Sequence, residues 1–90
     1  MALTELERSA AQELAEDLRQ RIELEQGGLQ SAQFKLAKLQ IRVKLFGKAD
    51  LDDEERARFA QVYPDAIARH EAEIAHLQAQ LDKLLAYAET

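Results

Sequence analysis

Two runs of apolar residues at heptad spacing, one in each half of the chain, constrain the fold more than any other feature of the sequence. The a positions of the first run are Ala15, Ile22, Leu29, Leu36 and Val43, and its d positions are Ala11, Leu18, Glu25, Ala32, Leu39 and Phe46. The second run has a positions Ala60, Ile67, Ile74, Leu81 and Ala88, and d positions Tyr63, His70, Leu77 and Leu84. Apolar residues at this spacing lie on one face of a helix and pack against a second helix. The sequence therefore predicts an all-α, coiled-coil protein.

The segment between the two runs carries signals that end one helix and begin another. Gly47 suits the left-handed position after a helix, and Asp50 suits the N-cap of the next one. The acidic residues 52–55 would then occupy the first turn, where negative charge is favourable. We expect one domain, residues 1–90, folded as an antiparallel hairpin with a helix over about 4–46, a turn at 47–50 and a helix over about 51–88.

Glycine and proline interrupt the helical pattern at two places. Each glycine of Gly27-Gly28 costs about 1 kcal/mol relative to alanine, which predicts either a kink or a turn that makes three helices. The heptad phase is unchanged from Ile22 to Leu29, so we favour one helix. Pro64 predicts either a kink or a short helix 51–62 followed by a second helix that begins at the proline. Residues 38–45 alternate polar and apolar as a strand would, but the heptad also accounts for them, and we favour the helix.

A tight turn near residue 48 would pair positions of the two helices whose numbers add to about 95 or 96. The expected apolar layers are Leu29 with Ile67, Ile22 with Ile74, Leu18 with Leu77, and Ala15 with Leu81. The same register places Glu25 opposite His70, so that two polar exceptions in apolar seams meet each other. This pair is either a pH-sensitive contact or a polar pair that specifies the register, and we favour the second interpretation.

Positive charge is concentrated in the middle of a chain whose net charge is −5. Residues 26–49 contain no acidic residue and five basic ones, namely Lys35, Lys38, Arg42, Lys44 and Lys48. In the expected register this segment faces the acidic residues 50–55, so charge complementarity between the two helices explains it. Nucleic-acid binding by a small helical dimer is the alternative. It is weaker, because acidic segments flank the basic one and only the first three of these residues share a helix face.

A second apolar stripe lies outside the predicted seam, and a two-helix hairpin cannot bury it. It contains Phe34, Ile41 and Leu45 of the first helix, with Phe59 and Val62 nearby across the turn. Exposed apolar stripes of this kind mark interfaces. We expect the hairpins to associate as a homodimer in a four-helix bundle, with a groove for a helix of another protein as the second option.

The sequence offers no constellation for catalysis. There is no cysteine, no nucleophile beside a base, no glycine-rich phosphate loop and no convincing set of metal ligands. The first twenty residues do not resemble a secretory signal, and no apolar run reaches the length of a membrane span. We therefore expect a cytoplasmic, non-enzymatic protein without cofactor or metal that acts as an adaptor, chaperone-like or assembly subunit. In length and architecture alone, the chain is similar to the small helical-hairpin co-chaperones of bacterial type III secretion.

Overall fold

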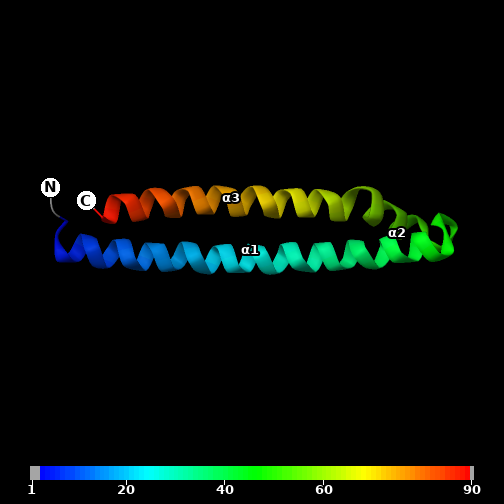
Figure 1. The fold of residues 1–90 in the computed structure, drawn as a ribbon, viewed down its shortest axis with the longest axis horizontal. Helices are drawn as coiled ribbons and strands as arrows, with labels where there is room; N and C mark the ends of the chain where they lie inside the picture. Colours follow the sequence, from blue (N-terminus) through cyan, green and yellow to red (C-terminus); the bar gives the residue numbers. More distant parts are fainter. Residues whose placement is uncertain (1–2, 90) are drawn as a thin grey trace.

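The computed structural model describes residues 3–89, which form one extended helical hairpin (Figure 1). The elements in chain order are α1 (Glu5–Phe46), the 3-10 turn η1 (Lys48–Asp50), α2 (Asp53–Ala57), the π turn η2 (Arg58–Val62) and α3 (Tyr63–Ala88). The two long helices run antiparallel, and the beginning of α1 and the end of α3 lie at the end of the rod opposite the turn (Figure 1). The molecule measures 65 × 18 × 14 Å. The predicted all-α hairpin is confirmed, and residues 38–45, which could have formed a strand, belong to α1.

Helix α1 is capped at both ends by its own sequence. The hydroxyl of Thr4 accepts a hydrogen bond of 3.1 Å from the backbone N–H of Glu7. Gly47 ends the helix with φ 83° and ψ 163°, and its N–H donates to the carbonyl of Val43 at 2.9 Å. The positive φ matches the expectation. The ψ is extended rather than helical, in a region that essentially only glycine adopts.

The second arm begins two residues later than the sequence indicated. Asp52, not Asp50, is the N-cap of α2, and it forms a capping box with Glu55. The side chain of Asp52 accepts from the N–H of Glu55 at 2.8 Å, and the side chain of Glu55 accepts from the N–H of Asp52 at 3.1 Å. The reason is the 3-10 turn, which takes up Asp50 before the helix can start.

The core is a narrow line of side chains between α1 and α3. The buried hydrophobic residues within 3–89 are Ala11, Ala15, Leu18, Ile22, Ala32, Leu39, Leu51, Leu77 and Leu81. All of them except Leu51 occupy predicted a or d positions. One cluster joins Ala15, Leu18 and Ile22 to Leu77 and Leu81, with Ile74 and Leu84 packed against it. The half of the predicted seam toward the open end of the hairpin is therefore present as a packed core.

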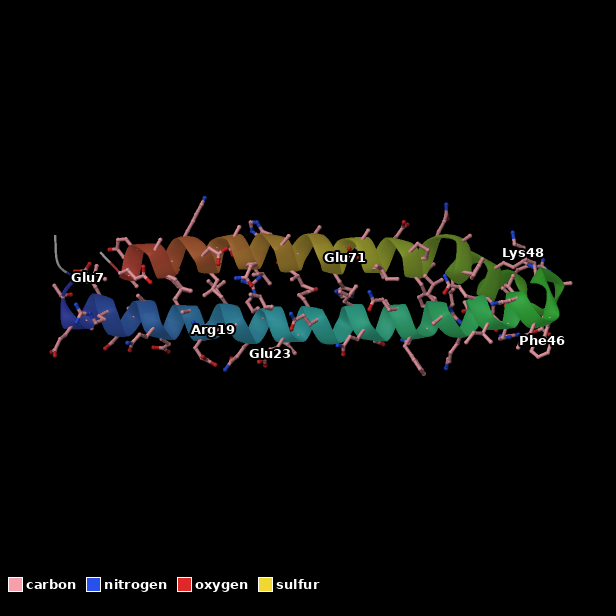
Figure 2. The ribbon with its side chains drawn as sticks, in the orientation of Figure 1. Glu7, Arg19, Glu23, Phe46, Lys48 and Glu71 are labelled. Atoms are coloured by element: carbon pink, nitrogen blue, oxygen red, sulfur yellow. The ribbon has the colours of Figure 1, made fainter. Side chains whose placement is uncertain are left out.

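The heptad prediction is wrong at Phe46 and at Ala60. The side chain of Phe46 is 67% exposed and points away from the second arm (Figure 2). Ala60 is exposed, whereas its neighbour Phe59 is half-buried. The cause of the second difference is the π turn, in which the N–H of Tyr63 donates to the carbonyl of Arg58, five residues back. A π turn holds an extra residue, so the inward-facing positions before it shift by one.

The π turn also explains how the second arm passes Pro64 without ending. Proline has no N–H, and in an α-helix its ring would collide with the carbonyl four residues earlier. A wider turn directly before the proline removes that conflict, and such single π turns occur inside otherwise regular helices. The backbone is helical from Asp53 through Ala88. The disturbance expected at Pro64 is thus a local change from α-helix to π-helix in the turn before it, and the helix does not end there.

The glycine pair lies inside an unbroken helix, so the three-helix alternative is wrong. The two glycines differ in their surroundings. A Cβ on Gly28 would lie 2.6 Å from Cε1 of His70, a distance too short for any real contact. A Cβ on Gly27 would meet nothing within 4 Å. A side chain at position 28 would therefore have to displace the imidazole of His70, whereas one at position 27 would displace nothing in the second arm.

Candidate interaction surfaces

The structure brings Glu25 and His70 together in the middle of the seam. The Nδ1 of His70 lies 2.6 Å from Oε2 of Glu25, and both side chains are roughly one third exposed. The residue numbers add to 95, as the predicted register requires. Gly28 leaves the space in which the imidazole ring lies. The contact, and the space that Gly28 leaves for the imidazole, agree with the predicted register.

Arg42 joins the two arms at the closed end of the hairpin. Its Nε donates to Oδ2 of Asp50 at 3.1 Å, and its Nη2 donates to the backbone carbonyl of Asp50 at 3.0 Å. Its Nη1 donates to the carboxylate of Glu55. The expected charge complementarity between the arms is present at this residue. Within residues 3–89, the side chains of Lys35, Lys44 and Lys48 form no ion pair. Most of the basic segment is therefore not neutralised inside the hairpin.

An open groove of about 640 Å³ lies beside this contact. Its lining residues come from both arms and are Lys35, Lys38, Leu39, Ile41, Arg42, Glu55, Arg58 and Tyr63. Sequence analysis placed Lys35, Lys38 and Arg42 on one face, and the groove contains all three. Heptad spacing does not predict Arg58 here, because Arg58 lies in the π turn. Tyr63 lies at a predicted d position, but the sequence did not indicate that it lines a groove with the basic residues. Lys44 and Lys48 lie outside the groove.

The contact with Arg42 makes the stability of the closed end depend on pH. The guanidinium of Arg42 lowers the pKa of Glu55 below its ordinary value of 4.5, and the capping bond with Asp52 lowers it further. A carboxyl group whose pKa is lower in the folded chain adds stability above its ordinary pKa and loses it as the pH falls through the folded value. We expect acidification from about pH 5 to pH 3 to lower the melting temperature less in Glu55→Gln than in the wild type.

Thermal unfolding followed by circular dichroism at several pH values measures this difference. Glu71→Gln is the matched control, because Glu71 is exposed on α3 (Figure 2). It should keep the wild-type dependence on pH. If the melting temperature changes equally with pH in Glu55→Gln and in the wild type, the contact with Arg42 does not stabilise the folded chain.

An exposed apolar surface lies on the side of α1 that faces away from α3. Seven residues, spaced alternately three and four apart, form what we call the outer stripe: Leu24, Gly27, Ser31, Phe34, Lys38, Ile41 and Leu45. Its large apolar members are all more than half exposed, from 57% at Ile41 to 77% at Leu24. The Nζ of Lys38 lies 5.3 Å from the centroid of the Phe34 ring, so this lysine lies along the stripe. Spacing of this kind is that of a coiled-coil seam.

The predicted contact residues divide between the two arms. Phe34, Ile41 and Leu45 share the outer stripe. Val62 is exposed on the π turn of the second arm, and Phe59 is half-buried there. Leu24 was missed, although its spacing from Phe34 and Leu45 was a signal that could have found it.

The chain matches no protein-family model, and neither a curated protein nor a solved structure is significantly similar to it. No helix within residues 3–89 is long and apolar enough to cross a membrane. In the same part of the chain, histidine and acidic side chains do not gather in a group of three that could hold a metal ion.

Proposed function

We propose that this protein is a non-enzymatic protein–protein interaction module, an adaptor, chaperone-like or assembly subunit, and that its contact surface is the outer stripe. The observation that supports this function is a row of exposed apolar side chains on a helix whose opposite face is already packed. Complete burial of a leucine, isoleucine or phenylalanine side chain contributes about 1.5 to 3 kcal/mol. The stripe has four such residues, and hairpin formation leaves all of them mostly in water.

The occupant of the stripe in this proposal is a second copy of the chain. Four lysines of the basic segment lack an ion-pair partner within residues 3–89, and the first turns of α1 are acidic. One chain thus offers both an apolar face with basic surroundings and a complementary acidic segment. Association of two hairpins would give a four-helix bundle, in which helices pack around a shared core.

Nucleic-acid binding remains the weaker alternative. The groove beside Arg42 holds four basic side chains and Tyr63, which favours an anionic ligand. However, Arg42 is occupied by Asp50 and Glu55, and the net charge of the chain is −5. Phosphate binding depends on basic residues that are available to the ligand.

The proposed function predicts a dimer that depends on the outer stripe. Light scattering on a sizing column should give the mass of two chains for the wild type and of one chain for the double variant Phe34→Glu, Ile41→Glu. Both side chains are exposed in the hairpin, so the variant should keep its helical circular dichroism. Two glutamates in an apolar contact would lose their hydration without a partner.

The matched control is Ala72→Glu, Ala79→Glu, which places two glutamates at the same spacing on an exposed face of α3. This control should remain dimeric. A monomeric wild type, or a dimer that survives in the stripe variant, would contradict the proposed contact.

A further inference from the structure

The spacing of the outer stripe continues to the beginning of α1. Stepping back from Leu24 by four and three residues in turn gives Gln20, Asp17, Glu13, Ala10 and Leu6. Leucines lie at both ends of this longer face, Leu6 and Leu45, and a third leucine, Leu24, lies near its middle. Leu6 is 81% exposed. A single face of α1 therefore carries a contact pattern along nearly the whole helix.

The two ends of α1 carry opposite charges. Residues 35–48 contain five basic residues and no acid, whereas residues 3–16 contain four acids, Glu5, Glu7, Glu13 and Glu16, against one base, Arg8. Two copies of α1 in a parallel pair would place like charges together along both halves. An antiparallel pair centred on the basic half would also place lysines against lysines. Only an antiparallel pair centred near the middle of α1 puts each basic half on an acidic half.

We infer that two copies of the protein associate through an antiparallel pairing of α1 with α1, about a two-fold axis near residues 25 and 26, in which facing residue numbers add to about 51. This inference rests on the proposed function and specifies its geometry. The two copies of α1 then form the middle of a flat four-helix bundle, and each α3 lies on the outside, because the outer stripe and the seam with α3 occupy opposite faces of α1.

Several layers of this pairing join residues of matching chemistry. Leu6 faces Leu45 of the other copy, Glu13 faces Lys38, and Leu24 faces Gly27. Gly27 has open space around its Cα within its own hairpin, so a leucine of the second copy can fill that space. Packing inside the hairpin does not need glycine at position 27, and the pairing with a second copy gives a reason for it. Asp17 faces Phe34, and Lys38, which lies beside the Phe34 ring, is within one turn of that aspartate.

Disulfide trapping tests the direction of the pairing, and the chain suits it because it contains no cysteine. Leu6→Cys and Leu45→Cys are made as separate variants, one of them labelled with nitrogen-15, and oxidised alone and as an equal mixture. In the antiparallel pair, like cysteines are about 58 Å apart, since 39 residues separate them at 1.5 Å each. We expect a disulfide dimer of one labelled and one unlabelled chain in the mixture, and almost none in either single sample.

A charge exchange tests the register. Lys38→Glu alone and Glu13→Lys alone should each weaken dimerisation about tenfold or more, because the layer occurs twice in the symmetric pair. The double variant, which restores opposite charges, should recover most of the affinity. Lys83→Glu on α3 is the control and should leave the dissociation constant within about twofold of the wild type.

The outcomes separate this inference from the proposed function. If the wild type is a dimer but each single cysteine variant links to itself, the stripe is a self-association face and the antiparallel geometry is wrong. If the wild type is a monomer, a second copy is not the occupant, and both the geometry and the proposed self-association fail. Failure of the charge exchange to restore affinity would overturn the register.

Discussion

Replacing Leu77 with alanine is expected to lower the free energy of unfolding by about 2 to 5 kcal/mol. Leu77 is 1% exposed and belongs to the cluster in which Leu18, Ile22 and Leu81 also lie. Truncation would remove the transfer energy of the lost carbon atoms and leave a cavity between two helices. A rod 14 Å across in its thinnest direction has no second layer of side chains behind this cluster. The loss should therefore be a large part of the total stability of the hairpin.

Leu85→Ala is the matched control for this prediction. It is the same change on the same helix, but Leu85 is 37% exposed. We expect a loss of about 1 kcal/mol or less. Urea unfolding followed by circular dichroism, at one fixed protein concentration, gives both values. Similar losses for Leu77→Ala and Leu85→Ala would mean that the cluster around Leu77 does not dominate the stability of the hairpin.

The sequence predicted the seam because burial in a two-helix hairpin follows the helical period. Leu18, Ile22, Leu77 and Leu81 could be found by counting residues, since a side chain at any other phase cannot reach the second helix. The exposure of Phe34 and Ile41 followed from the same count, because both lie opposite the seam. These features depend on local spacing, which the sequence displays directly.

The features that the sequence did not reveal depend on contacts between the arms. The π turn before Pro64 shifts the inward-facing positions by one residue, so that Phe59 replaces Ala60 and Arg58 reaches the groove beside Arg42. A heptad count assumes a constant number of residues per turn and cannot detect such a shift. The roles of the two glycines also depended on the position of His70, which belongs to the other helix.

The two adjacent glycines should respond in opposite directions to the same substitution. Gly27→Ala is expected to raise the free energy of unfolding by about 1 kcal/mol, because alanine favours the helix and the added methyl group meets nothing within the hairpin. Gly28→Ala is expected to lower it by about 1 to 3 kcal/mol, because the methyl group would overlap the imidazole of His70 and overpacking outweighs helix propensity. The background for both is the double variant Phe34→Glu, Ile41→Glu, in which contacts with a second copy do not contribute.

Replacing His70 with alanine tests whether Gly28→Ala destabilises the hairpin through the overlap with the imidazole or through an effect on α1 itself. In a His70→Ala background, the space beside position 28 is empty, and Gly28→Ala should then stabilise the hairpin by about 1 kcal/mol, as Gly27→Ala does. Urea unfolding of the parent protein, the two single variants and the double variant measures the coupling between positions 28 and 70 directly. A reversal of sign is expected because the three atoms nearest to the added carbon all belong to the imidazole of His70, which contacts Glu25. If Gly28→Ala destabilises the chain equally with and without His70, the fit between the imidazole and Gly28 does not determine how the two arms pair.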